Sequence, residues 1–153
     1  MTAQDNQAHK KKILILLASG FEEGSSIYCL DRMREAGLPV SVVGISAGWI
    51  KGVHGVTVRT DYSLDQLTPE MPYQLVVVSG GRQCVSSLLA DPRVRRLFES
   101  TLKNEGFVAT MLSAELALVQ AGIPALSTDS HFVQQGNMNI DEFTNRLIEL
   151  VLE

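Results

Sequence analysis

The sequence predicts an α/β protein, a three-layer sandwich in which helices cover both faces of a doubly wound, mostly parallel sheet. Apolar runs of strand length occupy 12–18, 40–44 and 75–79, and they are continuous instead of alternating with polar residues. Parallel strands buried on both faces have this pattern. Stretches with apolar residues at helical spacing separate the runs, and strands that alternate with helices favour a doubly wound sheet.

Composition limits the class of protein. The chain has 153 residues, of which 45% are hydrophobic, which suits one domain with a substantial core. We expect a flexible tail over 1–11 and a single domain over 12–153. The net charge of −4 argues against nucleic-acid binding, and no apolar run approaches the roughly 18 residues of a membrane span. Cys29 and Cys84 form no C-x-x-C motif, so we expect free thiols in a reducing cytoplasm.

Glycine and proline residues mark where the elements between these strands begin and end. A helix is predicted over 25–36, and Gly37 and Pro39 end it. Two short strands at 49–53 and 56–60 are predicted to form a hairpin.

The second half of the chain has clear helix starts. Asp91 is predicted to cap a helix that has Pro92 at its first position. Asn139 with Glu142 predicts the start of the last helix. Short strands are also expected near Ala125 and at Phe132-Val133.

The stretch over 105–123 joins a predicted strand to a predicted helix. The apolar run Phe107 to Leu112 suits a buried strand, and helical spacing begins at Ser113 and stops at Gly122. A strand that turns sharply into a helix is typical of a nucleophile elbow, which holds a reactive side chain in strained backbone. The tip of this elbow carries Leu112, which is not a nucleophile. We expect a leucine there to fill the space of the nucleophile and to relax toward ordinary backbone angles.

Three loops are predicted to meet beyond the carboxyl ends of the strands, at 20–25, 80–84 and 110–114. These loops contain motifs of a known family. The chain has G-F-E-E-x-x-x-I-Y at 20–28, R-M-R-E-A-G at 32–37, K-G-x-H-G at 51–55 and L-V-V-V-S-G-G at 75–81, followed by the elbow.

With these motifs in this order, the chain resembles the ThiJ/PfpI superfamily, which is related to the class I glutamine amidotransferase domain. That superfamily includes the Parkinson-associated deglycase, bacterial glyoxalases and the intracellular protease. The resemblance runs from Lys12 to Ile123 and implies a flavodoxin-like, class I glutamine amidotransferase-like fold. The path from Ile123 to Asn139 is much shorter than in the family, so the C-terminal region is expected to be shortened.

The resemblance also implies where the chemistry of the family would lie. The elbow cysteine of the family falls on Leu112, the residue after it on Ser113, and the carboxylate of the first loop on Ser25. Since the nucleophile and its acid are both replaced, we expect a non-catalytic protein that binds a protein partner or a small anion. Backbone N–H groups near the Gly-Gly pair form an anion-binding nest in the family. The expected ligand-binding residues are therefore Gly80, Gly81, Ser113, Ser25 and Cys84.

An alternative is a glyoxalase or deglycase-type enzyme, or a redox sensor, with its machinery relocated around Cys84. Glu22, Glu23 or His131 would then assist the thiol. The plainer interpretations are an inert, half-buried Cys84, glutamates at loop or interface positions, and Ser113 as the cap of the elbow helix. We favour these plainer interpretations.

A third hypothesis is a chaperone-like, stress-related dimer. The resemblance implies a homodimer formed through the first helix and the hairpin near His54. We expect no cofactor and no metal site, because His131, the histidine that could approach the pocket, has no thiol or carboxylate partner.

Overall fold

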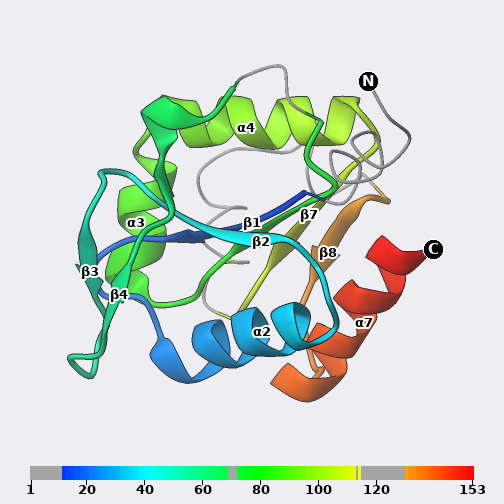
Figure 1. Ribbon diagram of the computed structural model, residues 1–153, viewed down its shortest axis with the longest axis horizontal. Helices are drawn as coiled ribbons and strands as arrows, with labels where there is room; N and C mark the ends of the chain where they lie inside the picture. Colours follow the sequence, from blue (N-terminus) through cyan, green and yellow to red (C-terminus); the bar gives the residue numbers. More distant parts are fainter. Residues whose placement is uncertain (1–11, 69–71, 113, 115–129) are drawn as a thin grey trace.

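The computed structural model describes residues 12–68, 72–112, 114 and 130–153. A six-stranded sheet in the order β5-β2-β1-β6-β7-β8 forms its centre, and every strand pair in this sheet is parallel. Helices α2 and α7 cover one face, and α3 and α4 cover the other (Figure 1). The predicted three-layer α/β architecture is therefore confirmed.

The strands of the six-stranded sheet are β1 (Ile13–Leu17), β2 (Val40–Gly44), β5 (Tyr62–Ser63), β6 (Leu75–Val78), β7 (Phe107–Thr110) and β8 (Phe132–Gln134). The helices are α2 (Glu23–Glu35), α3 (Arg82–Leu89), α4 (Pro92–Lys103) and α7 (Ile140–Leu152), and η1 (Leu64–Gln66) is a 3-10 turn.

The apolar runs form the central strands because these strands have no solvent-facing side. All residues of β1 and β6 are buried. Ile13 pairs with Val40 of β2 on one side and with Leu75 of β6 on the other. The chain builds outward from β1 in one direction and then crosses to β6. This reversal creates a topological switch point, where α/β sheets commonly place ligands.

Side-chain caps set the starts of three helices. Helix α2 starts earlier than predicted, because the Glu22 carboxylate accepts hydrogen bonds from the N–H groups of Gly24 and Ser25, both at 2.9 Å. The predicted caps at Asp91 and Asn139 are confirmed, since their side chains accept from Arg93 N at 2.9 Å and from Glu142 N at 2.8 Å. The sequence pattern thus locates two of these helix starts without help from tertiary contacts.

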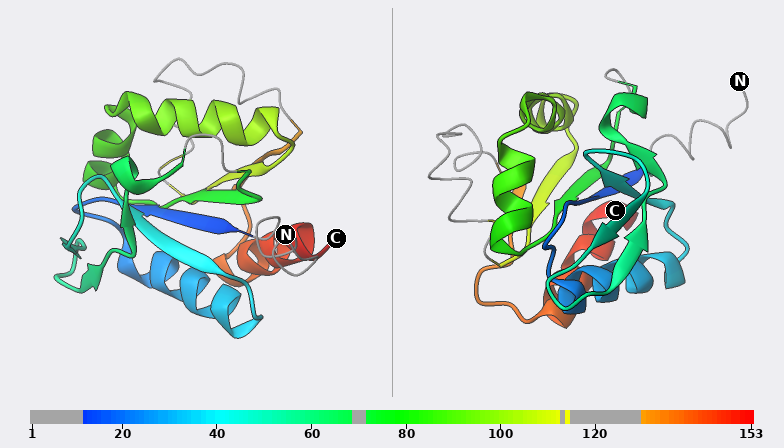
Figure 2. Two further views of the ribbon diagram at one scale, coloured as in Figure 1. Left: turned by 45° about the horizontal axis from the view of Figure 1, so that its top comes forward. Right: turned by 90° about the vertical axis from the view of Figure 1, so that its left-hand side faces the viewer.

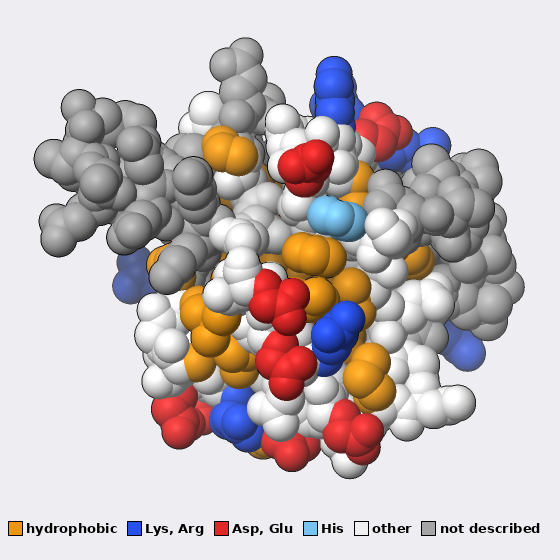
Figure 3. All heavy atoms as spheres, turned by 90° about the vertical axis from the view of Figure 1, so that its right-hand side faces the viewer, with side chains coloured by type: hydrophobic (Ala, Val, Ile, Leu, Met, Phe, Trp, Pro, Cys, Tyr) orange, Lys and Arg blue, Asp and Glu red, His pale blue; other side chains and the backbone are white. Residues whose placement is uncertain are grey.

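The predicted hairpin is confirmed as an antiparallel pair, β3 (Trp49–Lys51) and β4 (Thr57–Arg59). It projects near the end of the sheet at which β1 ends (Figures 1 and 2). On the opposite side of the molecule, acidic, basic and apolar side chains are interspersed (Figure 3).

One further predicted strand lies in the described part of the chain, whereas several other predictions do not. The strand at Phe132-Val133 is confirmed as β8. The tail over 1–11, the strand near Ala125, Ser113 and the elbow helix after residue 114 lie outside the described residues. Within the described part of the chain, no helix is both long and apolar enough to cross a membrane.

Candidate functional site

The three loops that follow β1, β6 and β7 touch one another through their backbones. Glu22 N donates to Gly80 O at 3.1 Å. A Cβ added to Gly81 would overlap the carbonyl oxygen of Gly20, and a Cβ added to Gly80 would overlap that of Leu112. Only glycine allows approach this close. The Gly-Gly pair therefore brings the first loop and the elbow together, as the sequence predicts.

Leu112 at the elbow differs from the expectation in one respect. Glu105 is the one described non-glycine residue with positive φ, so Leu112 avoids that strained region, as expected. Its side chain, however, is 51% exposed. The expectation that this leucine fills the space of the nucleophile is therefore wrong, because the preceding residue, Met111, fills the interior instead and is 1% exposed.

A buried hydroxyl near the elbow comes from Ser26, which the motif comparison does not single out. Its Oγ donates to Met111 Sδ at 3.7 Å. Ser25, which takes the place of the family carboxylate, is half-buried, and its N–H is used by the Glu22 cap. Ser26 is spaced at helical intervals from Cys29 and Met33, which are also buried, and this spacing could have indicated that Ser26 faces the core.

Both thiols are enclosed. Cys84 lies in the first turn of α3 and is completely buried, so the expectation of a half-buried side chain is wrong. Burial raises the pKa of the Cys84 thiol to about 11, although a hydrogen bond with the Ala18 backbone opposes this. Burial likewise raises the pKa of Cys29 to about 11, and its predicted place in the core is confirmed. Neither thiol forms an appreciable amount of thiolate at neutral pH, which a nucleophile requires.

The glutamates considered as helpers of Cys84 have structural partners. Glu22 caps α2, whereas Glu23 is buried and accepts hydrogen bonds from the N–H groups of His54 at 2.7 Å and Val56 at 3.1 Å. Burial alone would raise the pKa of Glu23, but these hydrogen bonds hold it below the usual value. Nδ1 of His54 lies 3.0 Å from Glu23 Oε1. Glu23 thus ties the hairpin to the start of α2.

The third proposed helper, His131, is also committed elsewhere. Its ring stacks on Phe107, with 4.4 Å between the centroids and 7° between the planes. Its Nδ1 lies 3.2 Å from Gly106 O. His131 therefore packs at the start of β7, at the opposite end of that strand from the elbow.

A cleft of about 500 Å³ opens beside Gly81, between the first loop, the hairpin and the start of α3. The side chains of Lys51 and Arg82 line it, both are exposed, and no acidic residue is among its lining residues. Neither cation has a side-chain hydrogen bond or ion pair within the described ranges. Little in the sequence indicates this pair, because its members lie on separate loops. The lining residues are Ser19, Gly20, Lys51, Gly52, Val53, Arg82 and Gln83.

Two buried hydroxyl oxygens lie at the carboxyl ends of β6 and β7. Ser79 Oγ and Thr110 Oγ1 are buried and have no hydrogen-bond partner within the described residues. Such groups normally require a partner, commonly an ordered water. No group of three or more potential metal ligands occurs in the described part of the chain.

The sequence of the chain is similar to a known protein family and to several characterised proteins. The profile of the DJ-1/PfpI family matches residues 11–148. The chain is 29% identical over 119 residues to the Parkinson disease protein 7 homolog of Danio rerio, covering 77% of this chain and 63% of that protein. It is 34% identical over 115 residues to a deglycase of Thermococcus kodakarensis, covering 73% and 66%. The chain thus spans about two thirds of the length of these curated relatives.

Solved structures agree on the fold. A DJ-1 superfamily protein from Salmonella typhimurium superposes with a TM-score of 0.79 at 20% identity, covering 93% of this chain and 90% of that one. Oxidized DJ-1 of Toxoplasma gondii superposes with a TM-score of 0.80 at 17% identity, covering 92% and 90%. The flavodoxin-like α/β fold is therefore shared with these proteins.

Proposed function

The chain belongs to the DJ-1/PfpI family, and from this membership together with the chemistry of its site we propose that it is a non-catalytic member that binds a small anion beside Gly81. The observation that carries the proposal is a pair of cations, Lys51 and Arg82, that have no ion pair among the described residues and lie in a cleft with no acid among its described lining residues.

The residues at the family's catalytic positions and the burial of both thiols support binding rather than catalysis. Leu112 stands where the resemblance places the nucleophile, and Ser25 stands where it places the acid. The thiols of Cys29 and Cys84 are buried, and burial raises the pKa of each to about 11. Because the thiolate is the attacking species, neither cysteine is suited to replace the lost nucleophile at neutral pH.

The local electrostatics favour an anion in the cleft. Arg82 is the first residue of α3, and backbone N–H groups at a helix start carry a partial positive charge. Arg82 and Lys51 add two full charges, and a guanidinium suits a carboxylate or phosphate through paired hydrogen bonds. Of the residues expected from the sequence to bind ligand, Gly80 and Gly81 are not among the lining residues of this cleft, although Gly81 directly precedes Arg82 in the chain. Ser25 and Cys84 are not among its lining residues, and Ser113 lies outside the described residues.

Inorganic phosphate tests the proposal. We expect saturable shifts of the amide NMR signals of Gly20, Gly52 and Gln83 as phosphate is added. Arg82→Gln and Lys51→Gln should each weaken binding about tenfold, the usual effect of losing one charge-assisted hydrogen bond. Arg59→Gln makes the same chemical change at an exposed site outside the cleft and should have no effect. Equal affinity in all four proteins would contradict the proposal.

Catalysis of the deglycase or glyoxalase type is the second candidate, and the names of the relatives favour it. The expected result is that the protein does not consume methylglyoxal above the buffer rate, and that Cys84→Ser changes nothing. Leu112→Cys should add a thiol that reacts with iodoacetamide, because residue 112 is half exposed. Turnover by the unmodified protein that Cys84→Ser abolishes would establish the enzyme and overturn the binding proposal.

We also propose a homodimer in the cytoplasm. The hairpin exposes apolar side chains, and Trp49 has 71% of its surface accessible to solvent, with Val53 and Val56 also exposed. Apolar surface gathered on one projecting element favours association. Two buried free thiols suit a reducing compartment. The same apolar surface would serve the chaperone-like alternative.

A further inference from the structure

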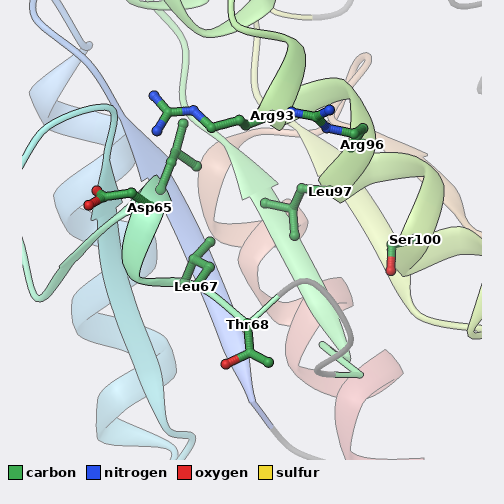
Figure 4. A pocket seen from close by; sticks show the side chains of 8 residues that line it. Asp65, Leu67, Thr68, Arg93, Arg96, Leu97 and Ser100 are labelled. Carbon is green, nitrogen blue, oxygen red and sulfur yellow. The ribbon is translucent and has the colours of Figure 1, made fainter.

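A second cavity, of about 560 Å³, lies away from the cleft beside Gly81. One wall is η1 and its continuation to Thr68, and the other is the face of α4 that carries Arg93, Arg96, Leu97 and Ser100 (Figure 4). Its volume falls within the range of about 300–1,000 Å³ that is usual for small-molecule sites. None of its lining residues is shared with the cleft. They are Leu64, Asp65, Leu67, Thr68, Arg93, Arg96, Leu97 and Ser100.

Three leucines form the middle of this groove. Leu67 comes from one wall and Leu97 from the other, and both are half-buried (Figure 4). Leu64 is buried at the base of η1 and also lines the cavity. A hydrocarbon group placed between the walls would contact all three side chains and remove their remaining apolar surface from water. Burial of this kind is favourable by about 25 cal/mol for each Å².

Two arginines of α4 lie at one end of the groove (Figure 4). The Arg93 guanidinium is paired with Asp91, with Nε 3.0 Å from Oδ1 and Nη2 2.7 Å from Oδ2. The pairing holds the pKa of the Asp91 carboxyl below its usual value, so the charge of Arg93 is already balanced. Arg96 is exposed and has no hydrogen-bond or ion-pair partner in the described part of the chain. Among the described residues, Arg96 is therefore the lining arginine without a direct ion pair, and the charge of Asp91 acts on it only from beyond ion-pair distance.

The opposite wall carries a negative charge, the carboxylate of Asp65. Asp65 accepts a hydrogen bond from the hydroxyl of Ser63, which holds the pKa of the Asp65 carboxyl below its usual value. Asp65 is therefore ionised at neutral pH and would repel any negative charge near its own wall, so a ligand carboxylate would lie on the side of Arg96, away from Asp65 (Figure 4). Thr68 and Ser100, at the end away from the arginines, are polar but uncharged (Figure 4).

From this arrangement we propose that the groove between η1 and α4 binds a small amphipathic monocarboxylate. Its hydrocarbon part lies against Leu64, Leu67 and Leu97, and its carboxylate accepts hydrogen bonds from Arg96. A guanidinium and a carboxylate match in geometry. An uncharged alcohol would lose the contact with Arg96, and an ammonium would be repelled by it.

Octanoate is the probe that tests this site in the 153-residue protein. Added octanoate should shift the amide NMR signals of Leu67, Leu97 and their neighbours in a saturable way. Arg96→Gln should weaken octanoate binding about tenfold, because one charge-assisted hydrogen bond is lost. As an exposed substitution on a helix surface, it should not unfold the protein. Octanol should bind the unmodified protein about tenfold more weakly than octanoate, and octylamine more weakly still.

Arg82→Gln is the matched control, since it removes the same charge from the other site. It should leave octanoate binding unchanged, just as Arg96→Gln should leave phosphate binding in the cleft unchanged. The proposal is overturned if octanoate shows no saturable effect, or if Arg96→Gln binds it as well as the unmodified protein. It is also overturned if octanol matches octanoate, or if Arg96→Gln changes the oligomeric state instead, which would indicate that another copy of the chain covers the groove.

Discussion

Gly81→Ala is expected to lower the free energy of unfolding by about 3–5 kcal/mol, from the strain of an unfavourable φ plus overpacking. Gly81 has φ 103°, and an added Cβ would overlap the carbonyl oxygen of Gly20 and lie 3.1 Å from Glu22 N. Both neighbours are backbone atoms, so no side-chain rotation relieves the contact. The first loop would have to move away from the Gly-Gly pair. A loss of this size is a large part of the total stability of a typical domain.

Gly37→Ala is the matched control for this substitution. Gly37 also has a positive φ, of 84°, but no atom lies within 4 Å of an added Cβ. Its cost should be limited to the backbone strain, about 1–2 kcal/mol. Urea unfolding of the two variants and the unmodified protein measures the difference. If Gly81→Ala were no more destabilising than Gly37→Ala, the contact between the first loop and the Gly-Gly pair would be less tight than described.

The substitution should also affect phosphate binding. A folded Gly81→Ala protein is expected to bind phosphate more weakly than the unmodified protein, because the loops that form the cleft would separate.

Much of the fold could be predicted from the sequence, because its signals are local. The continuous apolar runs predict strands that have no polar face, and β1 and β6 are buried along their full length. Asp91 and Asn139 predict helix starts, because a cap acts on N–H groups two or three residues away. The mostly parallel sheet also agrees with the prediction, because a chain of alternating strands and helices has few ways to build one sheet.

The candidate site was harder to predict, because it depends on contacts between distant segments. The sequence does not indicate that Glu23 is buried. Its partners are the N–H groups of His54 and Val56, which lie in the hairpin and are separated from Glu23 by the rest of α2 and by β2. The cation pair, Lys51 and Arg82, likewise forms only when the hairpin approaches α3. Leu112 directly follows the buried end of β7, but the exposure of its side chain depends on which neighbour, here Met111, faces the interior.

The buried thiols give the last prediction, which concerns alkaline pH. Burial raises the pKa of Cys84 and of Cys29 to about 11 in the folded protein, from 9.0 for an exposed thiol. Between these values the unfolded chain loses protons that the folded protein keeps, so the free energy of unfolding falls as the pH rises. The stabilisation is complete below pH 9 and is lost through pH 11. Each thiol should account for about 2–3 kcal/mol of the loss, since one pKa unit corresponds to about 1.4 kcal/mol.

Cysteine variants isolate this effect from other groups that titrate in the same range, such as Tyr73, whose pKa burial also raises. Cys84→Ala and Cys29→Ala should each be less stable at pH 7, because each leaves a small cavity. Each should nevertheless lose less stability than the unmodified protein between pH 9 and pH 11, and the double variant should lose the least. Chemical unfolding at several pH values measures these slopes. If all four proteins lost stability in parallel, the thiols would not be held protonated by the fold, and Cys84 would again be a candidate for reactive chemistry.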